Sequence, residues 1–199
     1  MPTWRMVDGV ELEERLVQVN GLSEVLPSGP GIYIWRRQFK ASPAAKSSPH
    51  AFRTWIKKTL TTPIAVIKRR EISHYASFEG LQLGGQALSL EKDRTLSRVS
   101  EADKGRKFVA GFVESLEQFA PVIYVGEAVS ILDRVRTHLK GDSDLRGVVE
   151  TELGLRFGDL TLFYCEVPVG DEENMKAVRT FLETLATKLT LAPCVRRIG

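Results

Sequence analysis

The sequence predicts an α+β fold in which helices pack against a small mixed sheet. Three short apolar runs supply the expected strands, at residues 31–37, 121–126 and 160–167, where side chains alternate between two faces as they do along a β-strand. Apolar residues at helical spacing follow the second run and again the third. The order strand, strand, helix, strand, helix therefore indicates one sheet covered by helices.

Length and composition are those of one globular domain. The chain has 199 residues and a net charge of +3. Hydrophobic residues make up 43% of the chain, which is enough to form a hydrophobic core. No apolar run approaches the roughly 20 residues of a membrane helix, and no signal-peptide core follows the first residues. We therefore expect a cytoplasmic protein with no membrane partner. Cys165 and Cys194 are far apart, a spacing that suggests neither a zinc site nor a disulfide framework.

The amino-terminal part is expected to begin with a packing helix. Asp8 is a suitable cap, and apolar residues recur at helical spacing until Asn20-Gly21 provides a stop. The turn at residues 27–31 then leads into the first strand. Residues 41–49 are small, polar and bounded by prolines, which is typical of a flexible loop.

The middle of the chain is expected to be a basic insertion, residues 38–120, within a single domain of residues 1–199. It should contain a short helix around Phe52 to Leu60, a strand at residues 64–67, a second extended piece, and a helix over residues 101–119. Residues 34–122 carry sixteen Lys and Arg against eight Asp and Glu, whereas the remainder carries twelve against seventeen. Positive charge concentrated in this way suits a polyanion such as double-stranded DNA, although a solvated basic surface explains it equally well. The candidate DNA contacts are Arg36, Arg37, Arg53, Lys57, Lys58, Lys68, Arg69 and Arg70.

Two cationic side chains stand out on the helix predicted after the second strand. Arg134 and His138 are four residues apart, so they are neighbours on one side of that helix. On a helical wheel His138 lies at one edge of the apolar stripe and Arg134 just outside it, while Arg136 falls on the opposite edge. The pair can bind a phosphate, or it can belong to a solvated cationic face.

Two tyrosines are expected on one face of the sheet. The alternation along the strands lets Tyr33 and Tyr124 point the same way when the strands pair. Each tyrosine taken alone suits a half-buried strand position. Together they can serve phosphodiester hydrolysis, which needs a group near the attacking water and positive charge near the phosphate. A phenol has a pKa of about 10, so it acts as a base only where a nearby cation lowers that pKa. Arg134 and a metal ion are the candidate cations.

The ordered set Gly31-Ile32-Tyr33, Tyr124-Val125-Gly126, Arg134, His138 and Glu183 resembles the active-site core of the GIY-YIG nuclease family, over residues 31–37 and 121–195. The resemblance implies a three-stranded antiparallel sheet flanked by helices, with a large inserted α/β segment. It implies a metal-dependent endonuclease that hydrolyses DNA phosphodiester bonds and is of the restriction type, since restriction enzymes of this family carry extra material between the two motifs. Mg²⁺ or Mn²⁺ would be the cofactor.

The resemblance also implies a role for each of five residues. Tyr33 and Tyr124 would position or deprotonate water, and Arg134 would stabilise the charge of the transition state. His138 would assist proton transfer or bind phosphate. Glu183 would hold the metal ion, although it could instead pair with Arg179, which lies four residues earlier on the same predicted helix.

The sequence departs from the family pattern at three places. Arg196 stands three residues after Pro193, where an asparagine is common, and the spacing from Glu183 to that proline is one residue longer than usual. Glu127 follows the second motif where several relatives carry lysine. The Arg196 departure leaves open a non-catalytic DNA-binding or partner-binding module on the same fold. A repair or mobile-element nuclease that recognises DNA structure is a third possibility. A homodimer is compatible with each of these readings.

Overall fold

The computed structural model describes residues 3–67, 70–73, 76–78, 81–84, 87–167 and 172–190, with only the backbone described over residues 63–84, at residue 118 and at residues 172–174. The chain divides into two compact units. The sheet unit comprises Met1–Arg37 and Pro121–Gly199, and the inserted unit comprises Gln38–Ala120. The inserted unit thus covers the same range as the expected insertion.

An antiparallel sheet of four strands forms the centre of the sheet unit. Its order is β1-β8-β2-β7, with β1 at Arg5–Asp8, β2 at Gly31–Arg37, β7 at Val122–Ala128 and β8 at Leu160–Glu166. The expected three-stranded sheet is therefore corrected to four strands, although the three predicted strands are all present and β2 is central. The strand β1 escaped prediction because its four residues are too few for an alternation to stand out, and because it pairs with β8, which lies about 150 residues away in the sequence.

The strand register places the two tyrosines on one face of the sheet. Tyr33 pairs with Gly126 and Trp35 pairs with Tyr124, and residues directly opposite each other on neighbouring strands share a face. The expected common face for Tyr33 and Tyr124 is confirmed. The other face carries Ile32 and Val125, among others.

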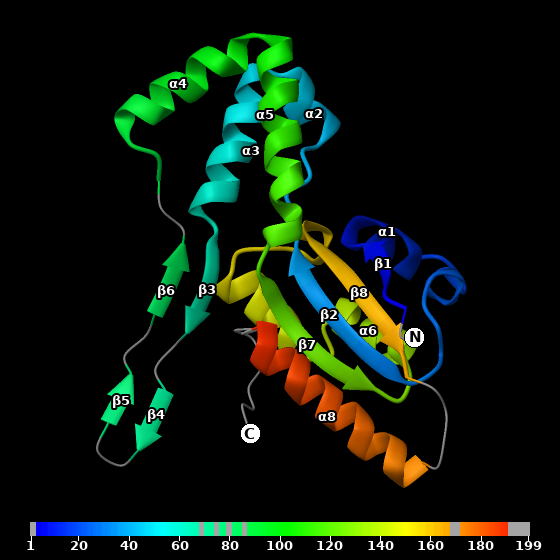
Figure 1. The fold of residues 1–199 in the computed structure, drawn as a ribbon. Helices are drawn as coiled ribbons and strands as arrows, with labels where there is room; N and C mark the ends of the chain where they lie inside the picture. Colours follow the sequence, from blue (N-terminus) through cyan, green and yellow to red (C-terminus); the bar gives the residue numbers. More distant parts are fainter. Residues whose placement is uncertain are drawn as a thin grey trace. The chain divides into compact units, whose positions relative to one another are not determined.

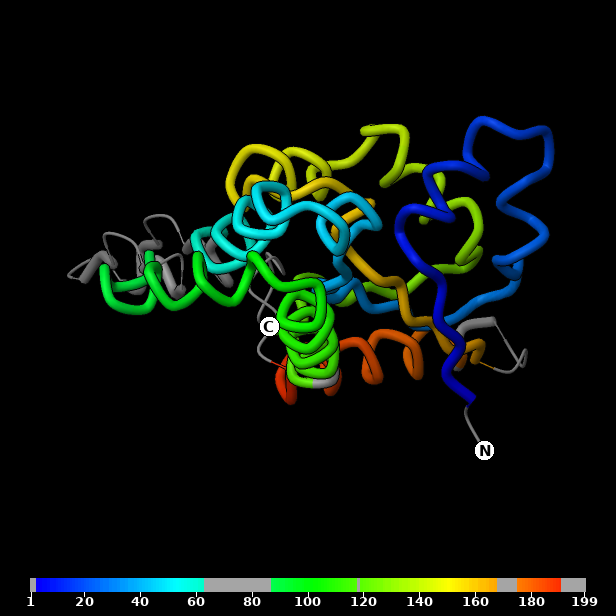
Figure 2. Tube along the Cα trace, turned by 90° about the horizontal axis from the view of Figure 1, so that it is seen from above, coloured from blue at the N-terminus to red at the C-terminus, as the bar shows by residue number. Residues whose placement is uncertain are grey.

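Helices cover both faces of this sheet. Figures 1 and 2 show α8 (Glu172–Thr190) on one side of the strands and α6 (Ile131–Lys140) on the other. The core cluster of Ile32 and Val125 includes Met175 and Ala186 of α8, so α8 covers the face away from the tyrosines. The remaining elements of the sheet unit are α1 (Gly9–Leu16), the 3₁₀ turns Gly21–Glu24 and Phe157–Asp159, α7 (Asp144–Gly147) and a π-helical turn at Val148–Glu152.

Local sequence signals account for α1 and α6. The Asp8 carboxylate accepts a hydrogen bond of 2.8 Å from the Val10 amide at the start of α1, as the capping prediction requires. At the start of α6 the Ser130 hydroxyl accepts one of 3.2 Å from the Asp133 amide. Gly141 ends α6 with a φ of 87°, a left-handed conformation that glycine adopts without steric cost.

The inserted unit combines four α-helices with paired strands. These elements are α2 (Pro43–Ser47), α3 (Pro49–Thr61), β3 (Pro63–Ile67), β4 (Arg70–Ser73), β5 (Ala76–Phe78), β6 (Leu81–Gly84), α4 (Leu90–Glu101), α5 (Asp103–Ser115) and a 3₁₀ turn at Leu116–Phe119. Antiparallel pairs join β3 to β6 and β4 to β5. A core of Phe52, Ile56, Leu96 and Ala110 joins α3, α4 and α5, so this unit has an interior of its own.

Two expectations for the inserted unit were wrong in detail. Residues 41–49, expected as a loop, contain α2, because Ser42 caps a helix whose first residue is Pro43; serine followed by proline marks a helix start as well as a turn. The helix expected over residues 101–119 begins at Asp103 and passes into a 3₁₀ turn at Leu116. The preceding helix α4 was not predicted, since Leu96 is its one buried apolar side chain.

Candidate active site

Tyr33 lies at the centre of the candidate site, against the glycine of the second motif. Its side chain is fully buried. A Cβ atom placed on Gly126 would lie 2.3 Å from the Tyr33 hydroxyl and 2.8 Å from the ring of Tyr124. Glycine at position 126 is therefore needed for close packing of the two tyrosines.

Four of the five predicted catalytic residues meet around the Tyr33 hydroxyl. This oxygen lies 2.8 Å from Nε2 of His138, and Nε of Arg134 donates a long hydrogen bond of 3.4 Å to it. The ring of Tyr124 lies 5.9 Å from the ring of Tyr33 and 5.6 Å from that of His138, measured between centroids. The spacing of four residues on α6 thus brings both of its functional side chains to one tyrosine.

The environment keeps Tyr33 in its neutral form. Burial raises the pKa of Tyr33 well above its ordinary value, and the nearby Tyr124 raises it further. Arg134 lowers this pKa through its hydrogen bond and its charge, but it does not outweigh burial. The cation expected to activate a phenol is therefore present, yet Tyr33 remains a hydrogen-bond donor at neutral pH.

His138 is a buried neutral imidazole. Burial lowers the pKa of His138 to about 3, and the charge of Arg134 contributes to the shift. A neutral imidazole has one donor nitrogen and one acceptor nitrogen. Its second nitrogen, Nδ1, lies 2.7 Å from the hydroxyl of Ser143, so both ring nitrogens have a partner.

Arg134 supplies the positive charge at the surface of the site. Burial lowers the pKa of Arg134, but hydrogen bonds and charge interactions with Tyr33 and Tyr124 raise it by more. The residue is exposed, so a held guanidinium faces solvent. Arg136 forms an ion pair of 2.8 Å with Asp133, as expected for a side chain on another edge of the helix.

Glu183, the fifth predicted residue, approaches the site from α8. Burial raises the pKa of the Glu183 carboxyl, and the charge of Glu127 raises it further, while a hydrogen bond from the Glu127 backbone and the charge of Arg134 lower it. The half-buried Glu183 therefore lies beside Glu127 and within the electrostatic reach of Arg134. Glu127 belongs to β7, which is an edge strand of the described sheet.

Glu127 was missed as a functional candidate. Its Oε2 accepts a hydrogen bond of 2.9 Å from Nε of Arg179, whose side chain is only 6% exposed. The pairing of Arg179 with Glu183 considered from the sequence is thus replaced by a pairing with Glu127. The sequence feature that could have identified Glu127 as a candidate is its position directly after Tyr124-Val125-Gly126.

The carboxylates at this edge fit a small divalent cation. Mg²⁺ keeps several of its waters in proteins and needs only one or two carboxylates, which Glu183 and Glu127 provide. Among the described residues no three His, Cys, Asp or Glu side chains gather into a metal-binding group. A bound cation would also offset the repulsion between the two adjacent carboxylates.

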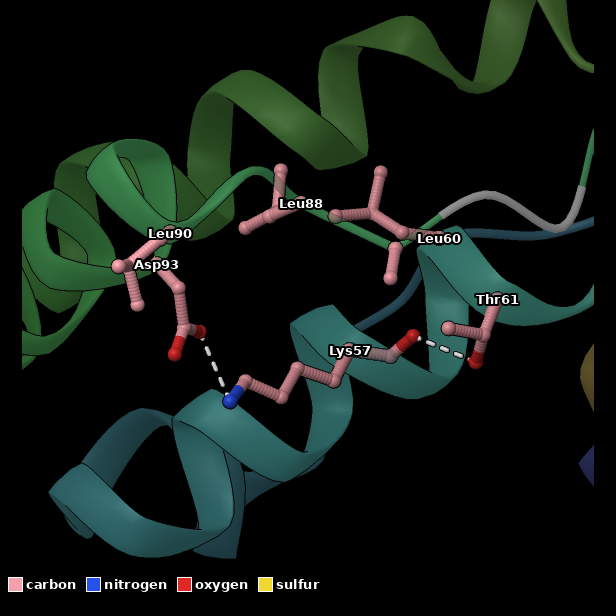
Figure 3. A pocket seen from close by; sticks show the side chains of 7 residues that line it. Lys57, Leu60, Thr61, Leu88, Leu90 and Asp93 are labelled. Atoms are coloured by element: carbon pink, nitrogen blue, oxygen red, sulfur yellow. Dashed lines mark hydrogen bonds and ion pairs between the residues drawn. The ribbon is translucent and has the colours of Figure 1, made fainter.

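Two predicted DNA contacts of the inserted unit, Lys57 and Arg53, are engaged in ion pairs. Lys57 of α3 forms an ion pair of 2.8 Å with Asp93 of α4, and both residues line a pocket of about 380 Å³. Figure 3 shows this pair among the other residues that line the pocket. Arg53 pairs with Glu101 at 3.1 Å, and Lys58 is exposed. Exposed ion pairs contribute only about 0–1 kcal/mol, so a phosphate could compete for these cations.

The other predicted DNA contacts differ in accessibility. Arg36 is half-buried, with its guanidinium 5.2 Å from the centre of the Phe163 ring. Arg37 is only 5% exposed, and burial lowers its pKa, which does not suit a residue that tracks a phosphate backbone. Of the remaining predictions, Lys68, Arg69, Pro193, Cys194 and Arg196 lie outside the described residues, and Arg70 is described only in its backbone.

The geometry defines a sheet unit with a hydrogen-bonded cluster of Tyr33, His138 and Arg134 and two carboxylates at one edge. No family model matches the chain, and neither does any curated protein or solved structure. Within the described ranges no helix is long and apolar enough to cross a membrane. The function is therefore inferred from the site itself.

Proposed function

We propose that this chain is a metal-dependent endonuclease that hydrolyses phosphodiester bonds in double-stranded DNA. The observation that carries the proposal is the exposed guanidinium of Arg134, held through its Nε by the buried hydroxyl of Tyr33, which also lies 2.8 Å from His138. A cation held in place before the substrate arrives stabilises developing negative charge without a further reorganisation cost. A phosphodiester in its transition state is the group that such a cation suits.

The accessibility of the two tyrosines separates their roles. Tyr124 is half-buried, whereas Tyr33 has no exposed surface. Tyr124 is therefore the tyrosine that would contact the attacking water. Tyr33 would act as a positioning residue, because its buried hydroxyl contacts both Arg134 and His138.

The metal ion would bind at the carboxylate edge. Glu183 would be its main ligand, and Glu127, with Oε2 held by Arg179, would be a second carboxylate. A bound Mg²⁺ or Mn²⁺ would polarise the phosphate and favour the ionised form of a water molecule. The charge of Arg134 lowers the pKa of Glu183, which supports assigning the cationic and carboxylate groups to one site.

Charge distribution supports DNA as the substrate. The inserted unit, residues 38–120, carries fourteen Lys and Arg against eight Asp and Glu. Such an excess attracts a polyanion in a salt-dependent manner. A restriction-type nuclease is the first candidate within this class, and a nuclease that acts on repair or mobile-element DNA is the second.

Plasmid cleavage tests the proposal. Supercoiled plasmid should be nicked or linearised by the purified chain in Mg²⁺ or Mn²⁺ and should remain intact in EDTA. Arg134→Ala should lose this activity, and the matched variant Arg136→Ala should keep it. Sequencing of the product ends would distinguish a sequence-specific enzyme from a structure-specific one. An intact plasmid with every metal and every DNA form would refute the proposal.

A non-catalytic DNA-binding or partner-binding module is the second candidate. The observation that favours it is the complete burial of Tyr33, which suits a structural hydrogen bond as well as a catalytic network. This candidate requires an affinity for DNA or for a protein that is changed neither by Mg²⁺ nor by Glu183→Gln. Cleavage separates the two candidates, because a non-catalytic module would bind DNA or protein in Mg²⁺ and still leave plasmid intact.

A further inference from the structure

Ser143 occupies a helix-capping position but does not cap the helix. It is the residue before α7, and its hydroxyl makes no capping hydrogen bond. Four other serines at helix N-caps of the described chain do accept such a bond from the third residue of their helix. They are Ser42, Ser48, Ser89 and Ser130. A serine cap contributes about 1 kcal/mol to a helix, so its omission at Ser143 points to another role for the hydroxyl.

The backbone turn after α6 brings Ser143 back to His138. The Gly141 amide bonds to the His138 carbonyl at 3.2 Å, and the Asp142 amide bonds to the Thr137 carbonyl at 3.1 Å. The left-handed Gly141 then reverses the chain. As a result the Ser143 hydroxyl lies 2.7 Å from Nδ1 of His138.

The protonation of Tyr33 decides which way these hydrogen bonds run. Arg134 donates to the Tyr33 oxygen, so the hydroxyl proton of this buried phenol needs a separate acceptor. Nε2 of His138, 2.8 Å away, can accept it only when that nitrogen carries no proton. The single proton of the neutral imidazole is then on Nδ1, where it is donated to Ser143.

We propose that Ser143 is a positioning residue whose hydroxyl accepts a hydrogen bond from Nδ1–H of His138 and so fixes the ring orientation in which Nε2 accepts the Tyr33 hydroxyl and the Tyr33 oxygen in turn holds Arg134. Its hydrogen bond to the ring would orient Arg134 through two intervening side chains. The tautomer assignment stands on the hydrogen bonds alone, whereas its effect on cleavage rests on the proposed nuclease function.

The loop does not depend on this hydroxyl for its position. Arg146 of α7 donates a hydrogen bond of 2.6 Å to the Leu139 carbonyl of α6, and Leu145 is buried. Ser143→Ala should therefore fold, and thermal unfolding of the variant checks this. Ser143→Thr keeps a hydroxyl, and Asp142→Ala is the control that alters the same loop without touching the ring.

Nitrogen-15 NMR of the full-length labelled chain tests the tautomer directly. Long-range proton–nitrogen spectra distinguish protonated from unprotonated imidazole nitrogens, and His138→Gln assigns the signal among the three histidines of the chain. The native protein should show protonated Nδ1 and bare Nε2. Ser143→Ala should keep this tautomer but move the Nδ1–H proton signal upfield, because the short hydrogen bond to the ring is lost, whereas Ser143→Thr and Asp142→Ala should match the native spectrum. A native Nε2–H tautomer, or a Ser143→Ala spectrum like the native one, would overturn the proposal.

Cleavage measurements test the consequence for Arg134. Loss of one hydrogen bond to the ring should slow cleavage about five- to tenfold in Ser143→Ala, with KM little changed and with recovery in Ser143→Thr. A native cleavage rate in Ser143→Ala would overturn the positioning role. Absence of cleavage by the native chain would refute the nuclease proposal, while the NMR result would still decide the tautomer.

Discussion

Acidification should destabilise the protein through His138 before most carboxylates titrate. The folded state holds the pKa of His138 at about 3, against an ordinary value of 6.5, because the ring is buried and lies near Arg134. Between these two values the unfolded chain binds a proton that the folded chain does not. The stability that depends on neutral His138 is therefore complete above pH 6.5 and is lost as the pH falls toward 3.

The expected loss is large enough to measure. Each pH unit below 6.5 removes up to about 1.4 kcal/mol of unfolding free energy, which makes about 2–3 kcal/mol between pH 6.5 and pH 4.5. The groups that face the ring are Tyr33, Tyr124, Arg134 and Ser143, and none of them is an acid that could hold the imidazolium. Urea unfolding at several pH values gives the free energies.

His138→Gln is the matched variant, because glutamine can still hydrogen-bond but does not titrate. At pH 7 the variant should be less stable than the native chain by about 1–3 kcal/mol, since it disturbs a buried hydrogen-bonded cluster. This difference should shrink as the pH falls to 4.5, because only the native chain loses the His138 contribution. A difference that stays constant over this range would refute the assignment of a buried neutral imidazole.

Three further predictions concern the charged groups. Arg134→Ala should slow cleavage about 10²- to 10³-fold, while Arg136→Ala should change it little, because Arg136 is paired with Asp133 on another edge of α6. Glu183→Gln should abolish Mn²⁺ binding measured by calorimetry and leave DNA affinity in EDTA nearly unchanged, because it removes a metal ligand but no cation. Replacing Lys57 and Lys58 by glutamine should flatten the slope of log affinity against log salt by about one to two, if both contact phosphates.

Control variants sharpen these tests. Equal rate losses in the two arginine variants would indicate a general basic face in place of a specific site. Glu14→Gln, at an exposed position of α1, should keep native Mn²⁺ binding, whereas Glu127→Gln should weaken it. Replacing Lys176 and Lys188, both exposed on α8, by glutamine is the charge-matched control for the salt slope. If the slope of log affinity against log salt is the same in the double lysine variant as in the native chain, the ion pair with Asp93 keeps Lys57 from DNA.

The strands and the site cluster were predictable where one short-range pattern decides the outcome. Alternation along two apolar runs placed Tyr33 and Tyr124 on one face, and helical spacing brought Arg134 and His138 together. Asp8 predicted the start of α1, because a capping carboxylate accepts from an amide only two residues away. Apart from the pairing of the two strands, these features depend on neighbours in the sequence, so they can be predicted without knowledge of the fold.

Other features depend on contacts between distant segments. The pairing of Arg179 with Glu127 joins α8 to β7 across a sequence separation of 52 residues, and no periodicity of the sequence predicts it. The raised pKa of Tyr33 follows from burial, which the tertiary fold determines, and this burial reverses the expectation that Arg134 would activate the phenol. Ser143 looks like an ordinary helix cap in the sequence, and only the turn at Gly141 shows its contact with His138.

The inserted unit leaves and re-enters the sheet at neighbouring positions, since the Arg37 amide lies 3.4 Å from the Pro121 carbonyl. The inserted unit therefore takes the place of the hairpin turn that could otherwise connect β2 to β7. A disordered segment of about eighty residues would cost the pairing of β2 with β7 about 2–3 kcal/mol more in chain entropy than a turn of four residues. A unit with its own core around Phe52 keeps its two ends together and largely removes that cost. Unfolding of the inserted unit alone would therefore loosen the two strands that carry Tyr33 and Tyr124, through the entropy of the connecting chain.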